Sequence, residues 1–304
     1  MEISELYSVK CLVQTDEFKT DDNIVMLTFD DGYIDQSINL MMSLVKNQTA
    51  GISFVCACLN LSDENIAKLL KLGIGVKIYT YEMLKSMNTG RWSPNILLRL
   101  FSPWLFEDID KLLYLDSDVL CIGNVGDLFD MDVDYVAMCN EISGNISESR
   151  EAIYRNQYPT QIYCNSGVVV INTERIRREY ALQEIFDSCC YSCEHYPYMD
   201  QDFLNVFFAG KINYINGFRY NFQAYELLDS VLYKKALKQS RLIHFSCGKP
   251  WNYHTDRRLI KLYLNHSGYD VMINRMKKVL RKNCLLLPLV SIKKIVKKTK
   301  SFFS

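Results

Sequence analysis

Short apolar, β-rich runs recur along the chain, and segments with helical periodicity separate several of them. The runs lie at residues 23–29, 51–57, 75–80, 111–116, 134–138, 167–172, 211–215 and 241–245. The helical patterns lie at residues 35–47, 62–73, 94–106 and 173–192. Near-continuous apolar strands are what a sheet covered on both faces requires. This alternation predicts an α/β fold with a single, mostly parallel central sheet and helices on both faces.

Charge is distributed unevenly along a chain whose formal net charge is zero. Of its 304 residues, 35 are Lys or Arg and 35 are Asp or Glu, but all residues charged at neutral pH after Asp270 are basic, ten in number. Residues 1–270 therefore carry 25 basic and 35 acidic side chains, a net charge of −10. An acidic body argues against a nucleic-acid-binding protein. We therefore divide the chain into an N-terminal extension without an assigned role (1–22), a main domain (23–270) and a basic tail (271–304).

The chain contains no segment that resembles an export signal or a membrane span. Residues 1–22 lack a basic region followed by an apolar one, and no stretch approaches the ~20 apolar residues that cross a bilayer. The 11 cysteines are interpreted as reduced thiols of a cytoplasmic protein. Cys189, Cys190, Cys193 and His195 would be a zinc site in an alternative interpretation. Adjacent cysteines on a predicted helix suit zinc poorly, so packing is the preferred role.

Carboxylates stand at the ends of two predicted core strands. Asp116 and Asp118 follow the apolar residues "LLYL" in "KLLYLDSDVL". Asp30 and Asp31 likewise follow "LTF" in "LTFDD". Burial of a carboxylate is costly unless it is paired or ligated. Ligands bind beyond the carboxyl ends of strands in open α/β sheets. A hard divalent ion, Mn²⁺ or Mg²⁺, is the simplest explanation for the closely spaced pair at 116 and 118.

Polar groups with complementary chemistry follow later in the chain. Asn165, Ser166 and Gly167 form a polar turn before a buried run, and Asp200, Gln201 and Asp202 open a predicted helix. His244 ends the last apolar run and is followed by Gly248 and Lys249. An imidazole can serve as a metal ligand, and a nearby lysine can serve as the cation for a phosphate.

Five ordered blocks together resemble a known family. "LTFDDGY", "LLYLDSDVL", "CNSGVVVIN", "DQDFLN" and "IHFSCGKPW" occur in the order and at the spacing of the retaining glycosyltransferases of family 8, which have the GT-A fold. The resemblance covers residues 23–252, and the family includes bacterial lipopolysaccharide galactosyl- and glucosyltransferases and glycogenin. It implies a mostly parallel sheet and a metal-dependent transferase that uses a UDP-sugar.

The resemblance also implies roles for individual residues. Asp116, Asp118 and His244 match the metal ligands of the family, with Ser117 near the ribose. The residues expected around the uridine are Leu27, Phe29, Asp30 and Tyr33. Tyr33 is expected to stack on the uracil, and a core tyrosine is the alternative. The residues expected to contact the sugar or diphosphate of the nucleotide-sugar are Arg99, Asn165, Ser166, Asp200, Gln201, Gly248 and Lys249.

The expected reaction moves galactose or glucose from a UDP-sugar to a hydroxyl of a glycan or glycolipid such as lipopolysaccharide or capsule, with retention of configuration. Gln201 matches the position beside the anomeric carbon, and its amide is a poor nucleophile, so front-side attack is favoured with Asp200, Gln201 and Asn165 as catalytic residues. Glycogenin-like or protein-directed glucosylation, or UDP-sugar binding without catalysis, are the alternatives. In one departure from the family, Gly248 directly precedes Lys249, whereas members commonly have two or three residues between the Gly and the Lys-Pro-Trp, which indicates a shortened diphosphate loop.

The tail at 271–304 has the pattern of an interfacial amphipathic helix. Beyond Pro288 the apolar residues Ile292, Ile295 and Val296 fall near one helical face, and lysines occupy most of the rest. We expect this tail to bind an anionic membrane surface without spanning it, which would place the protein at the inner face of the plasma membrane. A solvated basic tail is the alternative.

Overall fold

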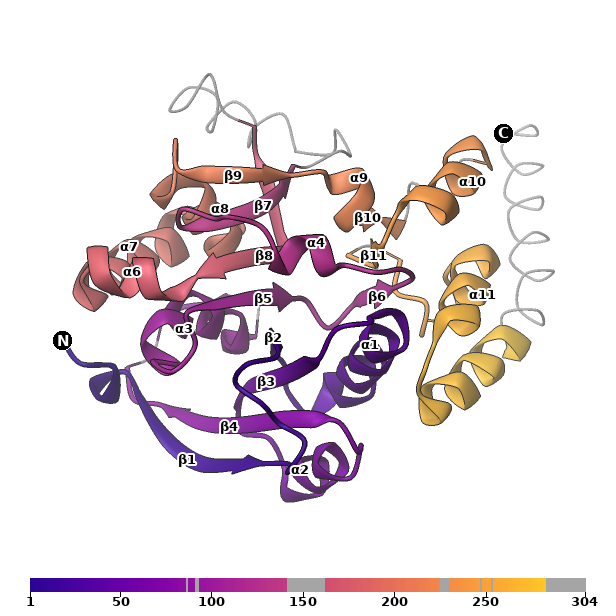
Figure 1. The fold of residues 1–304 in the computed structure, drawn as a ribbon, viewed down its shortest axis with the longest axis horizontal. Coiled ribbons are helices and arrows are strands. Elements are labelled where there is room, and N and C mark those ends of the chain that lie inside the picture. The colour runs from indigo at the N-terminus through magenta and orange to yellow at the C-terminus, as the bar shows by residue number, and fades with distance from the viewer. Residues whose placement is uncertain are drawn as a thin grey trace, which may run out of the picture.

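The computed structural model describes residues 1–85, 87–90, 93–140, 162–224, 230–246, 248–252 and 254–282. An eight-stranded sheet forms its centre, in the order β1-β4-β3-β2-β5-β8-β7-β9 (Figure 1). Its strands are β1 (Tyr7–Gln14), β2 (Asn23–Thr28), β3 (Ile52–Leu59), β4 (Gly75–Met83), β5 (Lys111–Leu115), β7 (Val136–Asn140), β8 (Cys164–Asn172) and β9 (Ile212–Ile215). The predicted α/β architecture is confirmed.

Parallel pairing joins β4, β3, β2 and β5 in the middle of the sheet, and it also joins β7 to β9. Antiparallel pairing occurs between β1 and β4 and on both sides of β8. The middle strands are buried on both faces, which explains their near-continuous apolar sequences. Asp116 and Ser117 directly follow β5, so they lie at the carboxyl edge of this parallel block.

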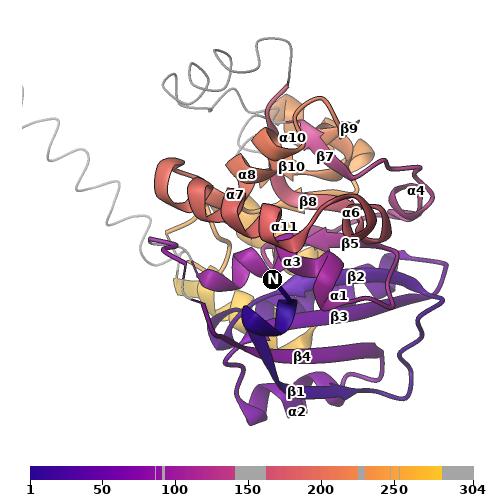
Figure 2. The same ribbon diagram turned by 90° about the vertical axis from the view of Figure 1, so that its left-hand side faces the viewer.

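Helices cover both faces of the sheet (Figure 2). Helices α1 (Ile34–Asn47), α2 (Asp63–Leu70) and α4 (Gly126–Phe129) share an apolar core with one face. Helices α3 (Leu98–Leu105), α6 (Thr173–Glu179), α7 (Leu182–His195) and α8 (Met199–Phe207) share a core with the other. Single 3₁₀ turns lie at Ile3–Glu5, Asp31–Tyr33 and Pro94–Leu97. The helix predicted over 173–192 is divided into α6 and α7 because Tyr180 and Ala181 are extended.

A smaller, three-stranded sheet lies beside the main one, and it was not anticipated. Its order is β10 (Phe222–Gln223), β11 (Leu242–His244) and β6 (Val119–Cys121). Helices α9 (Gly217–Tyr220) and α10 (Ser230–Gln239) precede β10 and β11, and α11 (Arg257–His266) packs on the sheet in a third core. Strand β11 runs antiparallel to β6, so that His244 pairs with Val119. This second sheet therefore brings the last sequence block beside Asp118.

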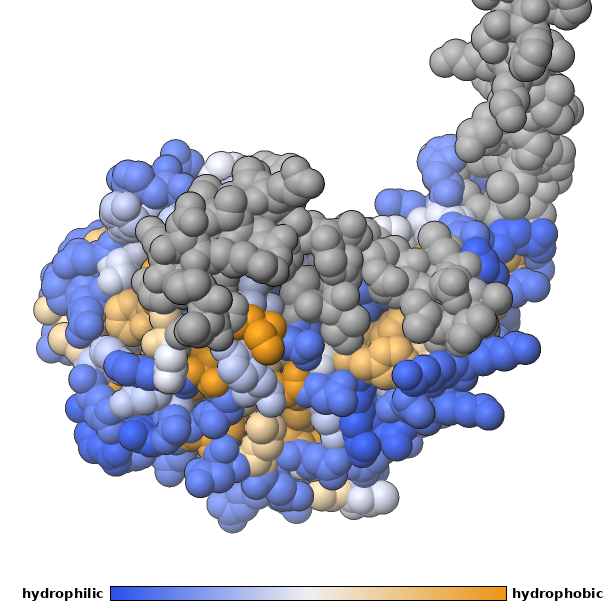
Figure 3. Space-filling view, turned by 90° about the horizontal axis from the view of Figure 1, so that it is seen from above, coloured by the Kyte–Doolittle hydropathy of each residue, from blue (hydrophilic) through white to orange (hydrophobic). Residues whose placement is uncertain are grey.

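The two ends of the predicted main domain extend further than the sequence indicated. Residues 1–22, to which the sequence assigned no role, contribute β1, the edge strand of the large sheet. Residues 270–282 are helical, and Met272, Met276 and Val279 are buried in the third core. The first part of the predicted tail is thus packed on the body, whereas residues 283–304 lie outside the described residues. On the right of Figure 3, where the C-terminal helices lie, the coloured side chains are mostly hydrophilic.

The cysteines of α7 are not grouped as metal ligands in the described part of the chain. Among the described residues, the one group of three or more ligand side chains close enough to share an ion is Asp116, Asp118 and His244. Cys189 is buried in the core, where its thiol contacts the sulfur of Met87 at 3.9 Å. Cys189 is thus placed as a packing residue, whereas Cys190 and Cys193 are only partly buried. No helix in the described part of the chain is both long and apolar enough to cross a membrane.

Candidate active site

Three side chains from two sheets form a candidate metal site. Nε2 of His244 lies 3.1 Å from Oδ1 of Asp118 and 3.7 Å from Oδ2 of Asp116. One ligand atom from each residue falls within 4.8 Å of the other two. Two carboxylates and an imidazole suit Mn²⁺ or Mg²⁺. The donor set therefore fits the divalent ion that the sequence predicted.

Gly167 makes room for the imidazole. A Cβ atom at this position would lie 2.3 Å from Cε1 of His244, which is closer than real Cβ contacts. Any other residue at position 167 would push His244 away from the two aspartates. The glycine of the "CNSG" block is thus explained by a close approach between β8 and β11.

Lys249 contacts the same carboxylate as His244. Its Nζ forms an ion pair with Oδ2 of Asp118, which is 8% exposed. Burial acts to raise the pKa of Asp118, but His244 and Lys249 together hold it below its usual range. Conversely, Asp118 overcomes the effect of burial and raises the pKa values of His244 and Lys249. The site therefore concentrates positive charge next to its metal-binding carboxylates.

Arg99 connects the aspartates of two different blocks. Its guanidinium lies 3.3 Å from Asp116 Oδ1 and 3.3 Å from Asp200 Oδ2, and it donates a 2.6 Å hydrogen bond to the carbonyl of Ser166. It also stacks over the ring of Tyr114, at 4.1 Å from the ring centre. Because the side chain is only 3% exposed, these contacts fix it in one position. The structure therefore brings Arg99 together with Asp116, Asp200 and Ser166.

Asp200 and Gln201 begin α8 and point toward β8. Burial raises the pKa of Asp200 to about 6, although Arg99 opposes the shift. The hydroxyl of Ser166 donates to Asp200 at 3.3 Å. Oε1 of Gln201 accepts hydrogen bonds from Asn165 Nδ2 at 3.0 Å and from the backbone N–H of Ser166 at 3.1 Å. The predicted catalytic residues thus form one connected group.

The residues expected around the uridine lie at the end of β2 and directly after it. Leu27 and Phe29 are buried, and the carboxylate of Asp30 accepts from the N–H of Gly32 at 3.0 Å. Tyr33 is 36% exposed, and its ring lies 6.1 Å from that of Trp251, edge to face. Tyr33 is thus not a core tyrosine.

Two further predicted residues flank this group. The hydroxyl of Ser117 accepts from that of Ser37 at 2.8 Å, which connects the D-x-D turn to α1. Gly248 has a positive φ of 74°, the conformation that glycine adopts at least cost. The short connection between Gly248 and Lys249 still lets the lysine reach Asp118.

Sequence reasoning missed two buried residues of this site, Asn221 and Tyr163. Asn221 lies between His244 and Asn165 and makes hydrogen bonds to both. The hydroxyl of Tyr163 accepts from Nε2 of Gln201 at 2.9 Å. Tyr163 directly precedes the "CNSGVVVIN" block, two residues before Asn165, and this position was the available signal. Asn221 lies outside every recognised block, and only the fold reveals it.

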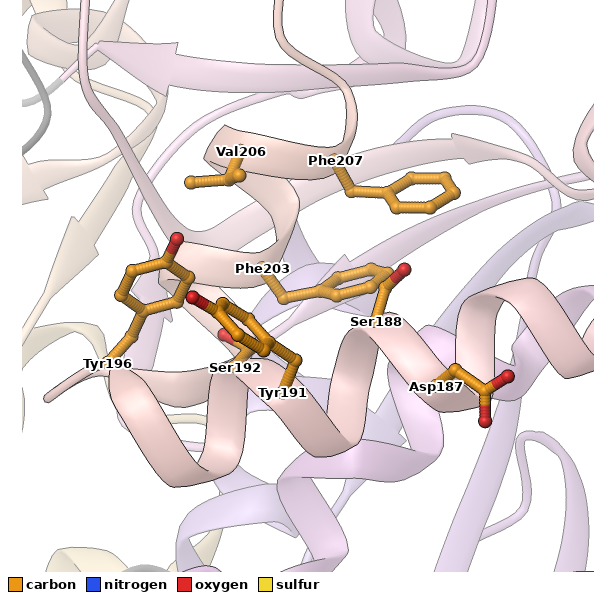
Figure 4. A pocket seen from close by; sticks show the side chains of 8 residues that line it. All are labelled: Asp187, Ser188, Tyr191, Ser192, Tyr196, Phe203, Val206 and Phe207. Carbon is orange, nitrogen blue, oxygen red and sulfur yellow. The ribbon is translucent and has the colours of Figure 1, made fainter. Parts of the chain in front are cut away.

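A separate pocket of about 370 Å³ lies between α7 and α8 (Figure 4). Its aromatic lining includes Tyr191, Tyr196, Phe203 and Phe207. None of the predicted site residues lines it. Phe203 and Phe207 of α8 extend into this pocket, whereas Asp200 and Gln201 of the same helix bond to Ser166 on β8. The pocket is therefore distinct from the metal-binding cluster.

Several relatives of the chain are named as glycosyltransferases. The chain is 28% identical to galactinol synthase 7 of Arabidopsis thaliana, covering 53% of this chain and 54% of the relative. It is 27% identical to glycosyltransferase GlyE of Streptococcus pneumoniae, covering 60% of this chain and 45% of the relative. It is also 27% identical to the lipopolysaccharide 1,3-galactosyltransferase of Salmonella typhimurium, covering 62% and 59%. The chain thus spans about half the length of these curated relatives.

Solved structures with the same fold include the galactosyltransferase LgtC, crystallised with analogues of its donor and acceptor sugars. The two match with a TM-score of 0.64 at 23% identity, over 79% of this chain and 95% of LgtC. This similarity confirms the expected GT-A fold. The model of Glycosyl transferase family 8 matches residues 24–255, which include all the predicted site residues. The chain therefore belongs to glycosyl transferase family 8.

Proposed function

We propose that this protein is a divalent-metal-dependent, retaining hexosyltransferase that moves galactose or glucose from a UDP-sugar to a hydroxyl of a glycan or glycolipid. The observation that carries the proposal is the cluster of Asp116, Asp118 and His244 within 4.8 Å, next to Lys249 and Arg99. Family membership supports the transferase class. The names of the lipopolysaccharide galactosyl- and glucosyltransferase relatives support the choice of hexose.

The leaving group of the proposed reaction is a diphosphate, on which negative charge grows as the glycosidic bond breaks. A Mn²⁺ or Mg²⁺ ion held by Asp116, Asp118 and His244 would neutralise part of this charge. Lys249 would leave Asp118 for the diphosphate once the ion replaces it. Arg99 would hold Asp116 and Asp200 in fixed positions. These preorganised charges are the largest contribution that we assign to catalysis.

Retention requires attack on the face that the leaving group vacates, or a double displacement. The residue that the family resemblance places beside the anomeric carbon is Gln201, whose amide bonds to the "CNSG" turn and is a poor nucleophile. We therefore favour front-side attack through an oxocarbenium-like ion pair. Gln201, Asn165 and Asp200 position the sugar, and the departing phosphate oxygen accepts the proton of the acceptor hydroxyl.

Hydrolysis of UDP-galactose and UDP-glucose, measured with and without MnCl₂, tests the proposal before the acceptor is known. We expect UDP release that requires the metal and is lost in Asp118→Asn. The matched control is Asp108→Asn, an exposed carboxylate that pairs with Lys77 at 3.1 Å. Metal-independent hydrolysis, or UDP-hexose binding without any hydrolysis or transfer to lipooligosaccharide acceptors, would contradict the proposal and favour a binding protein.

A further inference from the structure

A chain of side-chain hydrogen bonds leads from the metal site to α8. Nδ1 of His244 lies 2.9 Å from Oδ1 of Asn221, and Nδ2 of Asn221 donates to Oδ1 of Asn165 at 2.8 Å. Nδ2 of Asn165 in turn donates to Oε1 of Gln201 at 3.0 Å. The chain continues from Nε2 of Gln201 to the hydroxyl of Tyr163. We name the whole series, which ends at Asp202, the amide relay: His244, Asn221, Asn165, Gln201, Tyr163 and Asp202.

Backbone groups fix the direction of the amide relay independently. Oδ1 of Asn165 accepts from the N–H of Gly167 at 2.9 Å, and Oε1 of Gln201 accepts from the N–H of Ser166 at 3.1 Å. Because a backbone N–H can only donate, each of these amides must present its oxygen there. Their NH₂ groups then face the next acceptor in the series. If either amide were flipped, its NH₂ group would face two hydrogen-bond donors in place of its oxygen.

The two ends of the relay impose the same direction. His244 can present a lone pair on Nε2 to a metal only if Nδ1 carries the proton, and Nδ1 faces the oxygen of Asn221. At the other end, the hydroxyl of Tyr163 donates to the carboxylate of Asp202 and is thereby left to accept from Gln201. Every donor in the relay therefore points from the metal ligand toward Asp202.

We propose that Asn221 and Tyr163 are positioning residues that lock the amide of Gln201 in the orientation required for sugar transfer, and that Asn221 couples this orientation to the metal-binding tautomer of His244. The proposal rests on the proposed function for the role of Gln201. Asn221 and Tyr163 are 3% and 5% exposed, so water does not replace their hydrogen bonds. Partners of metal-bound histidines commonly change metal affinity by ~10- to 100-fold when they are removed.

Two substitutions at position 221 separate the contacts of this residue with His244 and with Asn165. Asn221→Asp keeps an oxygen that accepts from Nδ1–H of His244, but it removes the NH₂ group that donates to Oδ1 of Asn165. The amide of Asn165 must then turn its own NH₂ toward the new carboxylate and away from Gln201. We expect Mn²⁺ affinity, measured by calorimetry with MnCl₂ alone, to be unchanged or higher. We expect the kcat of sugar transfer or hydrolysis to fall about 10- to 100-fold, as misplaced catalytic groups typically cause. Unchanged kcat in a folded Asn221→Asp protein would overturn the proposal.

Asn221→Leu removes both contacts, so we expect it to weaken Mn²⁺ binding at least about tenfold and to lower kcat as well. The matched control is Asn39→Leu. Asn39 is equally buried and accepts from the N–H of Gly268 at 3.2 Å, outside the relay. The control should lower the melting temperature while sparing Mn²⁺ affinity. Equal Mn²⁺ affinity in wild type and folded Asn221→Leu would overturn the coupling.

Tyr163→Phe tests whether Tyr163 acts through Gln201. We expect about a tenfold lower kcat with an unchanged KM for the UDP-sugar, since the hydroxyl is buried and bonds to Gln201 and Asp202. In a Gln201→Ala background the same change should have no further effect, as expected for coupled residues. Tyr7→Phe is the matched control because the buried hydroxyl of Tyr7 has no partner among the described residues. The same loss of kcat in both backgrounds would overturn the positioning role.

A measurement without turnover distinguishes failure of this inference from failure of the proposed function. The ¹⁵N spectrum of histidine-labelled protein with Mg²⁺ should show the Nδ1–H tautomer of His244. In Asn221→Leu this tautomer should no longer be the single form present. If no UDP-hexose is turned over but the tautomer behaves in this way, the proposed function fails and the coupling stands. An Nε2–H tautomer in the wild type would overturn the coupling whatever the activity.

Discussion

At the scale of single residues, Asp118 has two functions that depend on one charge. It supplies a ligand to the candidate metal site, and it is the carboxylate partner of both His244 and Lys249. Because its pKa is lowered in the folded protein, its ionised form stabilises the fold. That stabilisation is present above the unfolded pKa of about 4 and is lost as the pH falls through the folded value.

Asp118→Asn should therefore abolish transfer and also destabilise the protein. The substitution leaves Lys249 without its carboxylate partner and His244 with only the more distant Asp116. Loss of one partner of a buried pair costs ~3–5 kcal/mol. Urea unfolding at pH 7 measures the loss, and repetition with MnCl₂ should show stabilisation of the wild type alone. Stabilisation of both proteins by Mn²⁺ to the same extent would contradict the metal assignment. Asp108→Asn, at an exposed carboxylate, should change less.

Asp200 has the opposite dependence on pH. Burial raises its pKa to about 6, so the folded protein binds this proton more tightly than the unfolded chain does. The resulting stabilisation is complete below pH ~4 and disappears as the pH rises through 6, a change of about 3 kcal/mol. Unfolding of the wild type and Asp200→Asn between pH 4 and 7 should show the wild type losing stability relative to the variant. Parallel pH profiles would exclude this ionisation.

At the scale of elements, the fold is extended by segments at both chain ends. Strand β1 covers the edge of β4, and the helix at 270–282 covers α11 and the small sheet. Met272, Met276 and Val279 follow one helical face at intervals of four and three residues, which is why they are buried together. This helix belongs to the body although its other faces are strongly basic.

Met276→Ala should accordingly destabilise the protein by about 2–5 kcal/mol, as large-to-small substitutions in cores do. Thermal unfolding of the variant measures the loss. Lys277→Ala on the exposed side of the same helix is the control and should stay within about 0.5 kcal/mol of the wild type. Equal melting temperatures for Met276→Ala and the wild type would mean that this helix does not pack on the body in solution.

At the scale of the whole molecule, positive charge gathers at one end. Residues 254–282 contain eight Lys or Arg and only two Asp, and most of these basic side chains are exposed. The basic residues beyond 282 continue the same charge. We propose that this end attaches the transferase to an anionic membrane surface, near a glycolipid acceptor, and that residues 283–304 contribute most of the binding.

Truncation after Lys282 tests this attachment without removing core residues, whereas truncation after Asp270 would delete Met272 and Met276. The shortened protein should lose most of its binding to vesicles that contain phosphatidylglycerol, while UDP-hexose hydrolysis persists. Vesicles of phosphatidylcholine alone are the control and should bind neither protein. Equal binding of both proteins to the anionic vesicles at low salt would exclude the tail as the anchor.

The sequence by itself determined the strands of the parallel block, the D-x-D pair, and the residues that the family resemblance placed around it. Local pattern decides these features, because a doubly covered strand must be apolar throughout and a carboxylate pair at its end needs a counter-charge. Only the tertiary structure decided that β11 pairs with β6 in a second sheet, that residues 270–282 join the core, and that Asn221 connects His244 to Asn165. These contacts join residues far apart in the chain, and a buried asparagine has no periodicity that reveals its partners. Its role depends on which hydrogen-bonding groups the fold brings to it.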